Sequence, residues 1–285
     1  MNKLLACIDA SIYAASVCDH AAWAAKRLSA SVELLHVIQR PDSVKARHDL
    51  SGAVGLGAKS ALLEELVRID ESEGRLAQEQ GRLLLKAAEE SLRAAGIEEV
   101  TLVHRHGGIV ETVIEREEGA DMVVIGKRGA SADFAAGHLG SKVERVVRAS
   151  IRPVLVASRS FKPIETVVIA YDGGASSKKA VEFVAGSPLF KGVAVHLVMA
   201  GPDDATHRER LSWAEARLKD AETLIATVDL QQGPAEKVIA DHIRDQGGDM
   251  LVMGAYGHSP LRTLIIGSTT TAMMRTCQVP VLLFR

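Results

Sequence analysis

A glycine-bearing segment near the end of the chain has the residue types and spacing to bind phosphate. Gly254 and Gly257 enclose two residues, nine more follow, and then come Gly267 and Ser268. The segment follows an apolar run over residues 250–253, which is typical of a buried strand. Glycine leaves room for a ligand, and a helix beginning near Gly267 would present unpaired N–H groups and a positive dipole end to an anion. Glycine-rich turns after strands often only turn the chain, so this segment alone leaves a purely structural interpretation open.

The chain carries an earlier version of the same segment within a repeated order of landmarks. Each version has an aspartate closing a first apolar run, a Gly-x-x-Glu element, a glycine segment and a proline-led apolar strand. They are Asp9, Gly108–Glu111, Gly126–Ser141 and Pro153–Val156 in the first copy, and Asp172, Gly233–Glu236, Gly254–Ser268 and Pro280–Leu283 in the second. Four matched landmarks in one order indicate two copies of one domain.

These motifs resemble those of the universal stress protein family in a tandem two-domain form. The family's nucleotide motif is Gly, two residues, Gly, nine residues, Gly and then Ser or Thr, which the second copy matches. The first copy departs from it, because ten residues separate Gly129 from Gly140. We expect a first domain over residues 1–158 with a degenerate glycine motif, and a second over residues 165–285 with the full motif. The resemblance implies an α/β fold of two doubly wound parallel sheets, adenine nucleotide alpha hydrolase-like, with strand order 3-2-1-4-5.

Composition restricts the partners that the chain can have. Its 285 residues carry 34 basic and 36 acidic side chains, a net charge of −2, so no overall attraction to nucleic acid or an anionic membrane is expected. The three cysteines form no CxxC pair, which argues against a disulfide framework or a zinc site. No leader pattern or membrane-length apolar run is evident, so we predict a cytoplasmic protein.

Strands alternating with helices predict a parallel sheet covered on both faces. Expected strands are 3–8, 32–38, 101–105, 120–125 and 153–157, then 166–171, 193–199, 223–229, 249–253 and 279–284. Expected helices are 12–29, 60–95, 108–118 and 140–150, then 175–186, 205–222, 234–246 and 267–276.

Some local features of these elements are also predicted. Ser11 is the expected N-cap of the first helix, and an interruption of the second helix near Gly74 stays open. Residues 41–57 are predicted as a loop or as a lid over a ligand. His104 and His106 share one strand face, but no third metal ligand is evident nearby.

The resemblance implies a set of nucleotide-binding residues in each domain. Glycines would let the backbone approach ribose and phosphate, hydroxyls at the helix start would hold phosphates, and the strand-end aspartate would contact the nucleoside or a divalent cation. In the second domain the set is Asp172, Val198, Gly254, Gly257, Gly267, Ser268 and Thr269. In the first domain a weaker set is Asp9, Val37, Gly126, Gly129, Gly140 and Ser141, with positive charge added by Lys127 and Arg128.

The resulting hypothesis is a stress-response regulator or sensor that binds ATP or another adenine nucleotide, with or without Mg, mainly in the second domain. No nucleophile–base pair, metal cluster or Walker lysine is evident, so at most slow ATP hydrolysis is expected. One alternative is an interaction module with a vestigial nucleotide site. Another is an adenylating enzyme, in which residues 172–177 would resemble a pyrophosphatase loop, although that loop's leading Ser and internal Asp are missing. The last apolar strands of the two domains are expected to pair about a pseudo-twofold axis, and a homodimer of whole chains stays open.

Overall fold

A computed structural model describes residues 2–38, 56–129, 140–221, 224–255 and 268–285. The first half contains strands β1 (Asn2–Cys7), β2 (Ala30–Ile38), β3 (Val100–His106), β4 (Met122–Gly126) and β5 (Val154–Ala157). Its helices are α1 (Ala14–Leu28), α3 (Leu56–Ala94), α4 (Ile109–Glu117) and α5 (Ser141–Ala149).

The second half repeats this alternation. Its strands are β6 (Thr166–Ala170), β7 (Ala194–Ala200), β8 (Ile225–Gln231), β9 (Met250–Gly254) and β10 (Val281–Phe284). Its helices are α6 (Ala175–Gly186), α7 (Ala205–Asp220), α8 (Ala235–Gln246) and α9 (Ser268–Thr276), with a 3₁₀ turn η2 at Pro188–Phe190.

The strands form one ten-stranded sheet in the order β3-β2-β1-β4-β5-β10-β9-β6-β7-β8. Each half therefore has the predicted order 3-2-1-4-5, and all pairs within a half are parallel. The fold class expected from the sequence is confirmed. The inner strands are buried on both faces, which is why they appear in the sequence as short continuous apolar runs.

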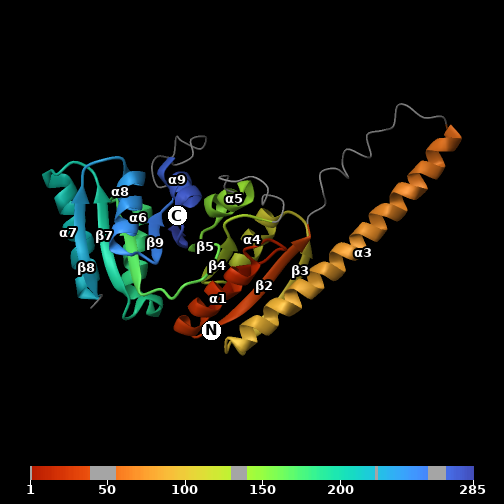
Figure 1. The fold of residues 1–285 in the computed structure, drawn as a ribbon, viewed down its shortest axis with the longest axis horizontal. Coiled ribbons are helices and arrows are strands. Elements are labelled where there is room, and N and C mark those ends of the chain that lie inside the picture. The colour runs from red at the N-terminus through yellow and green to blue at the C-terminus, as the bar shows by residue number, and fades with distance from the viewer. Residues whose placement is uncertain (1, 39–55, 130–139, 222–223, 256–267) are drawn as a thin grey trace.

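The two halves join where β5 runs antiparallel to β10. Val156 lies opposite Val281, and Val154 lies opposite Leu283. Figure 1 shows these strands at the centre of the molecule, with β8 and β3 toward its two outer sides. A further contact crosses between the halves, because the Arg27 guanidinium at the end of α1 donates to the backbone carbonyls of Leu189 and Lys191.

Helices cover both faces of the sheet, and each face has an apolar core that continues through both halves. Side chains of α1, α3, α6 and α7 pack on one face, with Ala21, Leu92 and Val181 among them. Side chains of α4, α5, α8 and α9 pack on the other. In each half, the first two connecting helices therefore lie on one face of the sheet and the last two on the other, as in a doubly wound sheet.

Several predicted details differ from the structure. Ser11 is not the N-cap of α1, which begins at Ala14 without a side-chain cap; the Ser11 hydroxyl instead accepts a hydrogen bond from the Tyr13 N–H. α3 starts at Leu56, earlier than expected, and runs through Gly74 without a break. Gly74 has no neighbour within 4 Å of the position of a Cβ, so no packing constraint interrupts the helix there. The predicted loop therefore ends before Leu56, and its remainder lies outside the described residues.

The strand-end histidines have a neighbour that spacing did not reveal. His36 on β2 lies opposite His104 on β3, with 5.2 Å between ring centroids, and His106 stacks on His104 at 6.4 Å. Among the described residues, these imidazoles and other ligating side chains do not form a group that could hold a metal ion. A search of the same residues for a helix long and apolar enough to cross a membrane found none.

Candidate functional site

The carboxyl ends of β6 and β9 lie side by side at the point where strand order reverses in the second half. β6 pairs with β7 on one side and with β9 on the other. α6, which follows β6, packs on one face of the sheet, and α9, which follows β9, packs on the opposite face. Doubly wound sheets bind ligands at such a reversal, because the two connections diverge there.

Asp172 follows β6 at this edge and organises the start of α6. Its Oδ1 accepts a hydrogen bond from the Gly174 N–H at 2.8 Å and another from the Ser177 hydroxyl at 2.5 Å. The side chain is exposed, so its charge remains close to solvent. These two bonds fix the direction of the carboxylate before any ligand arrives.

Gly254, at the end of β9, touches the same helix start. A Cβ at Gly254 would lie 2.7 Å from the Ser177 amide nitrogen and 3.0 Å from the Ser176 side chain. Real Cβ atoms do not approach backbone so closely, so the glycine is required by the packing of β9 against α6. Asp172, Ser177 and Gly254 thus converge, but the need for glycine at position 254 does not depend on a ligand.

Val198, a predicted nucleotide-binding residue, lies on the inner strand β7 of the second half. It is buried opposite Ala170, and its carbonyl accepts the Tyr171 N–H at 2.8 Å. The equivalent bond in the first half joins the Ile8 N–H to the carbonyl of Leu35.

Leu35, not Val37, is therefore the counterpart of Val198. Cys7 pairs with Leu35 as Ala170 pairs with Val198. The partly exposed Ala200 stands at the level of Val37. Val37 and Val198, which hold the same place in the two predicted sets, are therefore not at equivalent positions. A shift of two residues along a strand keeps each side chain on the same face, so the sequence pattern did not reveal the difference.

The rest of the second-half motif is described only in part. Gly257 and Gly267 lie outside the described residues. Ser268 is the first residue of α9, and Thr269 follows it with a partly buried side chain. The Thr271 hydroxyl, in the first turn of α9, is buried without a hydrogen-bond partner among the described residues. The free backbone N–H groups at the start of a helix, together with a hydroxyl that has no partner, are hydrogen-bond donors that suit an oxyanion.

The predicted residues of the first half gather at the carboxyl ends of β1 and β4. Gly126 ends β4, and a Cβ at Gly129 would lie 2.9 Å from the Asp9 carboxylate. A Cβ at Gly140, the N-cap of α5, would lie 3.6 Å from the Arg128 Cα. Ser141 begins α5. The ten residues between Gly129 and Gly140, one more than in the family motif, lie outside the described part of the chain.

The two basic residues of this turn have different roles. The Lys127 ammonium donates to the Cys277 carbonyl of the second half at 2.6 Å, and burial lowers the pKa of this lysine. Cys277 directly follows α9, so the first glycine turn contacts the end of the helix whose start is the candidate phosphate site of the second half. Arg128 Nε is buried without a hydrogen-bond partner among the described residues. Arg128 is therefore the cation that an anion bound in the first half would meet.

Arg210 of α7 is a residue that sequence reasoning missed. Its Nη1 donates to the Asp172 carbonyl at 3.4 Å, and its Cδ would lie 2.5 Å from a Cβ at Gly173. Gly173 has φ of +79°, a left-handed conformation that glycine adopts without strain. Arg210 thus places a guanidinium beside the carboxyl end of β6. The sequence contains no motif that would identify this residue of α7 as a contact of Asp172.

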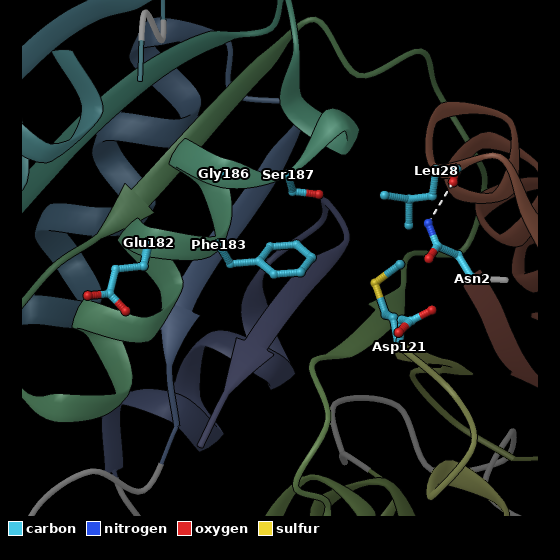
Figure 2. A pocket seen from close by; sticks show the side chains of 8 residues that line it. Asn2, Leu28, Asp121, Glu182, Phe183, Gly186 and Ser187 are labelled. Carbon is cyan, nitrogen blue, oxygen red and sulfur yellow. Dashed lines mark hydrogen bonds between the residues drawn. The ribbon is translucent and has the colours of Figure 1, made fainter. Parts of the chain in front are cut away.

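Two cavities lie between the halves, away from these residues. One, of about 360 Å³, is lined by Asn2, Leu28, Asp121, Met122, Glu182, Phe183, Gly186 and Ser187. Figure 2 shows Phe183 and Ser187 of the second half facing Asn2, Leu28 and Asp121 of the first. The other, of about 370 Å³, shares Glu182 and Phe183 with it. The first cavity opens at the amino ends of β1 and β4, opposite the edge that carries the glycine turns, and neither cavity is lined by a predicted nucleotide-binding residue.

Comparisons with known proteins agree with the repeated architecture. The family model described as the universal stress protein family matches residues 1–158 and again residues 163–285. A universal stress protein of Synechocystis is 37% identical over the full length of both chains. A universal stress protein of Mycobacterium tuberculosis is 26% identical over 62% of this chain and 65% of its own. The crystal structure of a universal stress protein from Archaeoglobus fulgidus covers 100% of this chain and 98% of its own with a TM-score of 0.73, at 21% identity, which supports the fold.

Proposed function

Since the chain belongs to the universal stress protein family, we propose that it binds ATP or a related adenine nucleotide, mainly in its second half. In this role it would report nucleotide or stress state to other components rather than turn over substrate quickly. The observation that carries the proposal is the convergence of Asp172 and Gly254 on the start of α6, at the carboxyl ends of β6 and β9. In the sequence, the full glycine motif begins at Gly254 and ends at Ser268.

Different residues of this chain would bind different parts of the nucleotide. The N–H groups at the start of α9 would bind phosphate oxygens, with Ser268 and Thr269 as added hydroxyl donors. Asp172, held by Gly174 and Ser177, would face the ribose or a magnesium ion. When bound, a magnesium ion would supply positive charge against the phosphates. Gly257 and Gly267 would keep the connection clear of side chains, as the family motif implies.

The most direct test is to denature the purified full chain and identify released nucleotide by chromatography. A parallel thermal-shift series should add millimolar MgATP, AMP and GTP separately. ATP or AMP should stabilise the protein by about 2.7 kcal/mol at a hundredfold excess over Kd. Finding no nucleotide and no adenine-dependent shift would refute the proposal.

A second candidate function is an interaction module with a vestigial nucleotide site. It is favoured by the packing of Gly254 against Ser177 and by the bonds within the turn at Asp172, since both features serve the fold even without a ligand. This alternative predicts that substitutions in either glycine motif leave every adenine nucleotide signal unchanged.

We also propose that the β5–β10 pair holds the two halves together in solution about a pseudo-twofold axis. Antiparallel pairing of equivalent strands is the relation that such an axis produces. The three cysteines are free and buried, which suits a reducing compartment, so the proposal includes a cytoplasmic location.

A further inference from the structure

α3 is a long helix whose C-terminal part packs against the body of the molecule. Its 39 residues span about 58 Å, and Figure 1 shows its N-terminal part projecting beyond the sheet. Leu85, Ala88 and Leu92 are buried against the sheet. The helix approaches β3 closely at Gly81, where a Cβ would lie 2.4 Å from the His104 ring. Before Gly81, the side chains of α3 that the structure describes are exposed or partly exposed.

The outer face of α3 carries a regular apolar stripe. Ile69, Leu76 and Leu83 are 39%, 59% and 53% exposed and lie seven residues apart. Leu76 precedes the buried Leu85 by nine residues, which places the two side chains about 180° apart around the helix axis. Leu66 lies three residues before Ile69, which is the shorter of the two spacings in a heptad seam. We call Leu66, Ile69, Leu76 and Leu83 the α3 stripe.

The spacing and charge of this face indicate what covers it. A seven-residue apolar period is the seam of a coiled coil, and a helix with the same period buries such a seam along its length. The flanking charges are of mixed sign and pair within the helix: Arg68 with Glu65 at 3.7 Å, Arg75 with Glu71 at 3.9 Å and Arg82 with Glu79 at 2.6 Å. Such a face has no one-sided charge to attract nucleic acid or an anionic membrane. A second copy of this chain offers both the same period and the same mixed charge.

We propose that the α3 stripe docks on the α3 stripe of a second copy and forms a two-stranded coiled coil. Pairing over the full length of both helices, about 58 Å, in a strip about 10 Å wide would bury roughly 600 Å² per copy, about 1,200 Å² in total, which reaches the lower end for a specific interface. The α3 stripe itself covers about 26 Å of that length. The dimer is therefore concentration-dependent. It leaves both candidate nucleotide sites free, because they lie at the strand ends of each body.

The two helices run antiparallel in this pair. In a parallel, in-register pair Glu73 would lie beside its own copy, and two like charges at a seam position repel each other. In the antiparallel pair Leu66 faces Leu83 of the second copy, and Glu73 faces Leu76. Each body then lies on the outer side of its own helix, opposite the stripe, where it does not obstruct the seam.

The first experiment compares three full-length proteins by analytical ultracentrifugation at about 1–100 μM, a range suited to an interface of this size. The unmodified chain should move from its 30.4 kDa monomer toward a dimer as concentration rises. Leu76→Glu should weaken the dimer at least tenfold, because it places a second negative charge in the seam, opposite Glu73 of the other copy. Val67→Glu is the matched control, because Val67 is 52% exposed on the same helix. It lies five full turns before Leu85, so it is on the same side of the helix as Leu85 and on the side opposite the α3 stripe. Circular dichroism should show equal helix content in all three proteins.

A second experiment tests the orientation by disulfide cross-linking. The three native cysteines are buried, so they give little background. An antiparallel seam predicts that Glu73→Cys chains cross-link faster to Leu76→Cys chains than to themselves. A monomer at every concentration, a dimer that Leu76→Glu leaves intact, or stripe-dependent binding to phospholipid vesicles in place of dimerisation would each overturn the proposal. Faster cross-linking of each variant to itself would overturn the antiparallel arrangement.

Discussion

The two halves share one topology, but the carboxyl ends of their first and fourth strands differ in chemistry. In the first half Gly129 faces the Asp9 carboxylate, and Lys127 and Arg128 bring positive charge to the glycine turn. In the second half Gly254 abuts the backbone at Ser177, and the buried Ala255 takes the position of Lys127. One half therefore has the cations and the other has the family's glycine spacing. A repeated order of strands and helices does not ensure that both copies bind the same ligand.

The helices that link the second and third strands show the same divergence on a larger scale. α7 has 16 residues and buries Leu211, Ala214 and Leu218 along its length. α3 has 39 residues, and among its described side chains the buried apolar ones lie near its C-terminal end. The same place in the topology thus holds a packing helix in one half and a projecting arm in the other.

The largest expected effect concerns the contact that joins the halves. Val281→Lys places an unpaired charge in the buried β5–β10 pair and should cost about 3 kcal/mol or more of the free energy of unfolding. Leu102→Lys is the control, since Leu102 is 41% exposed on the edge strand β3 at the far end of the sheet, and its effect should stay within about 0.5 kcal/mol. Urea unfolding measures both.

Expressing residues 1–160 and 161–285 separately tests the same contact. Each fragment would expose a last strand and should aggregate or self-associate, and mixing the two should recover one compact species. Two soluble monomeric fragments, each as stable as the intact chain, would show that the halves do not depend on each other.

The sequence was sufficient for the architecture because its signals are local. Buried parallel strands appear as short apolar runs, and Asp9 and Asp172 mark where such runs end. Strand order came from the family resemblance, since no residue pattern states which strands are neighbours. The start of α1 was misplaced at Ser11 because a serine before an apolar stripe is a good N-cap signal even where its side chain bonds elsewhere.

The details of the candidate site were less accessible because they depend on packing between distant segments. Val198 and Ala200 differ by one full pleat repeat, so alternation alone could not choose between them. The bond from Lys127 to Cys277 joins residues that approach only when the two halves pack. The approach of Ser177 to Gly254, which gives that glycine a structural role, likewise arises from how α6 lies on the sheet.

An intermediate effect is expected from matched substitutions in the two glycine motifs. Gly267→Val should weaken adenine nucleotide binding about a hundredfold, equivalent to about 2.7 kcal/mol, because a side chain would occupy the space before the phosphate-binding helix. Gly140→Val should weaken it by less than about tenfold if the second half is the main site. Isothermal titration with ATP measures both changes, and circular dichroism checks that each variant is folded. Equal losses, or a larger loss at Gly140, would reverse the assignment of the main site.

The smallest effect separates the structural roles of two glycines at the strand ends. Gly254→Ala brings a Cβ within 2.7 Å of the Ser177 amide nitrogen, so the start of α6 must shift, at a cost of about 1–3 kcal/mol in the free energy of unfolding. Gly129→Ala meets only Oδ2 at the end of the Asp9 side chain, at 2.9 Å, and a shift of this oxygen by a few tenths of an ångström relieves the contact while Oδ1 keeps its bond from the Ser11 N–H. Alanine also reduces the conformational freedom of the unfolded chain, which offsets about 0.4–1 kcal/mol, so the change at Gly129 should be close to neutral. Urea unfolding should show a lower midpoint with an unchanged slope for Gly254→Ala and almost no shift for Gly129→Ala. If the two variants lost equal stability, the close packing of β9 on α6 would not be the reason that position 254 requires glycine. Contact with a bound ligand would then be the better explanation for this glycine.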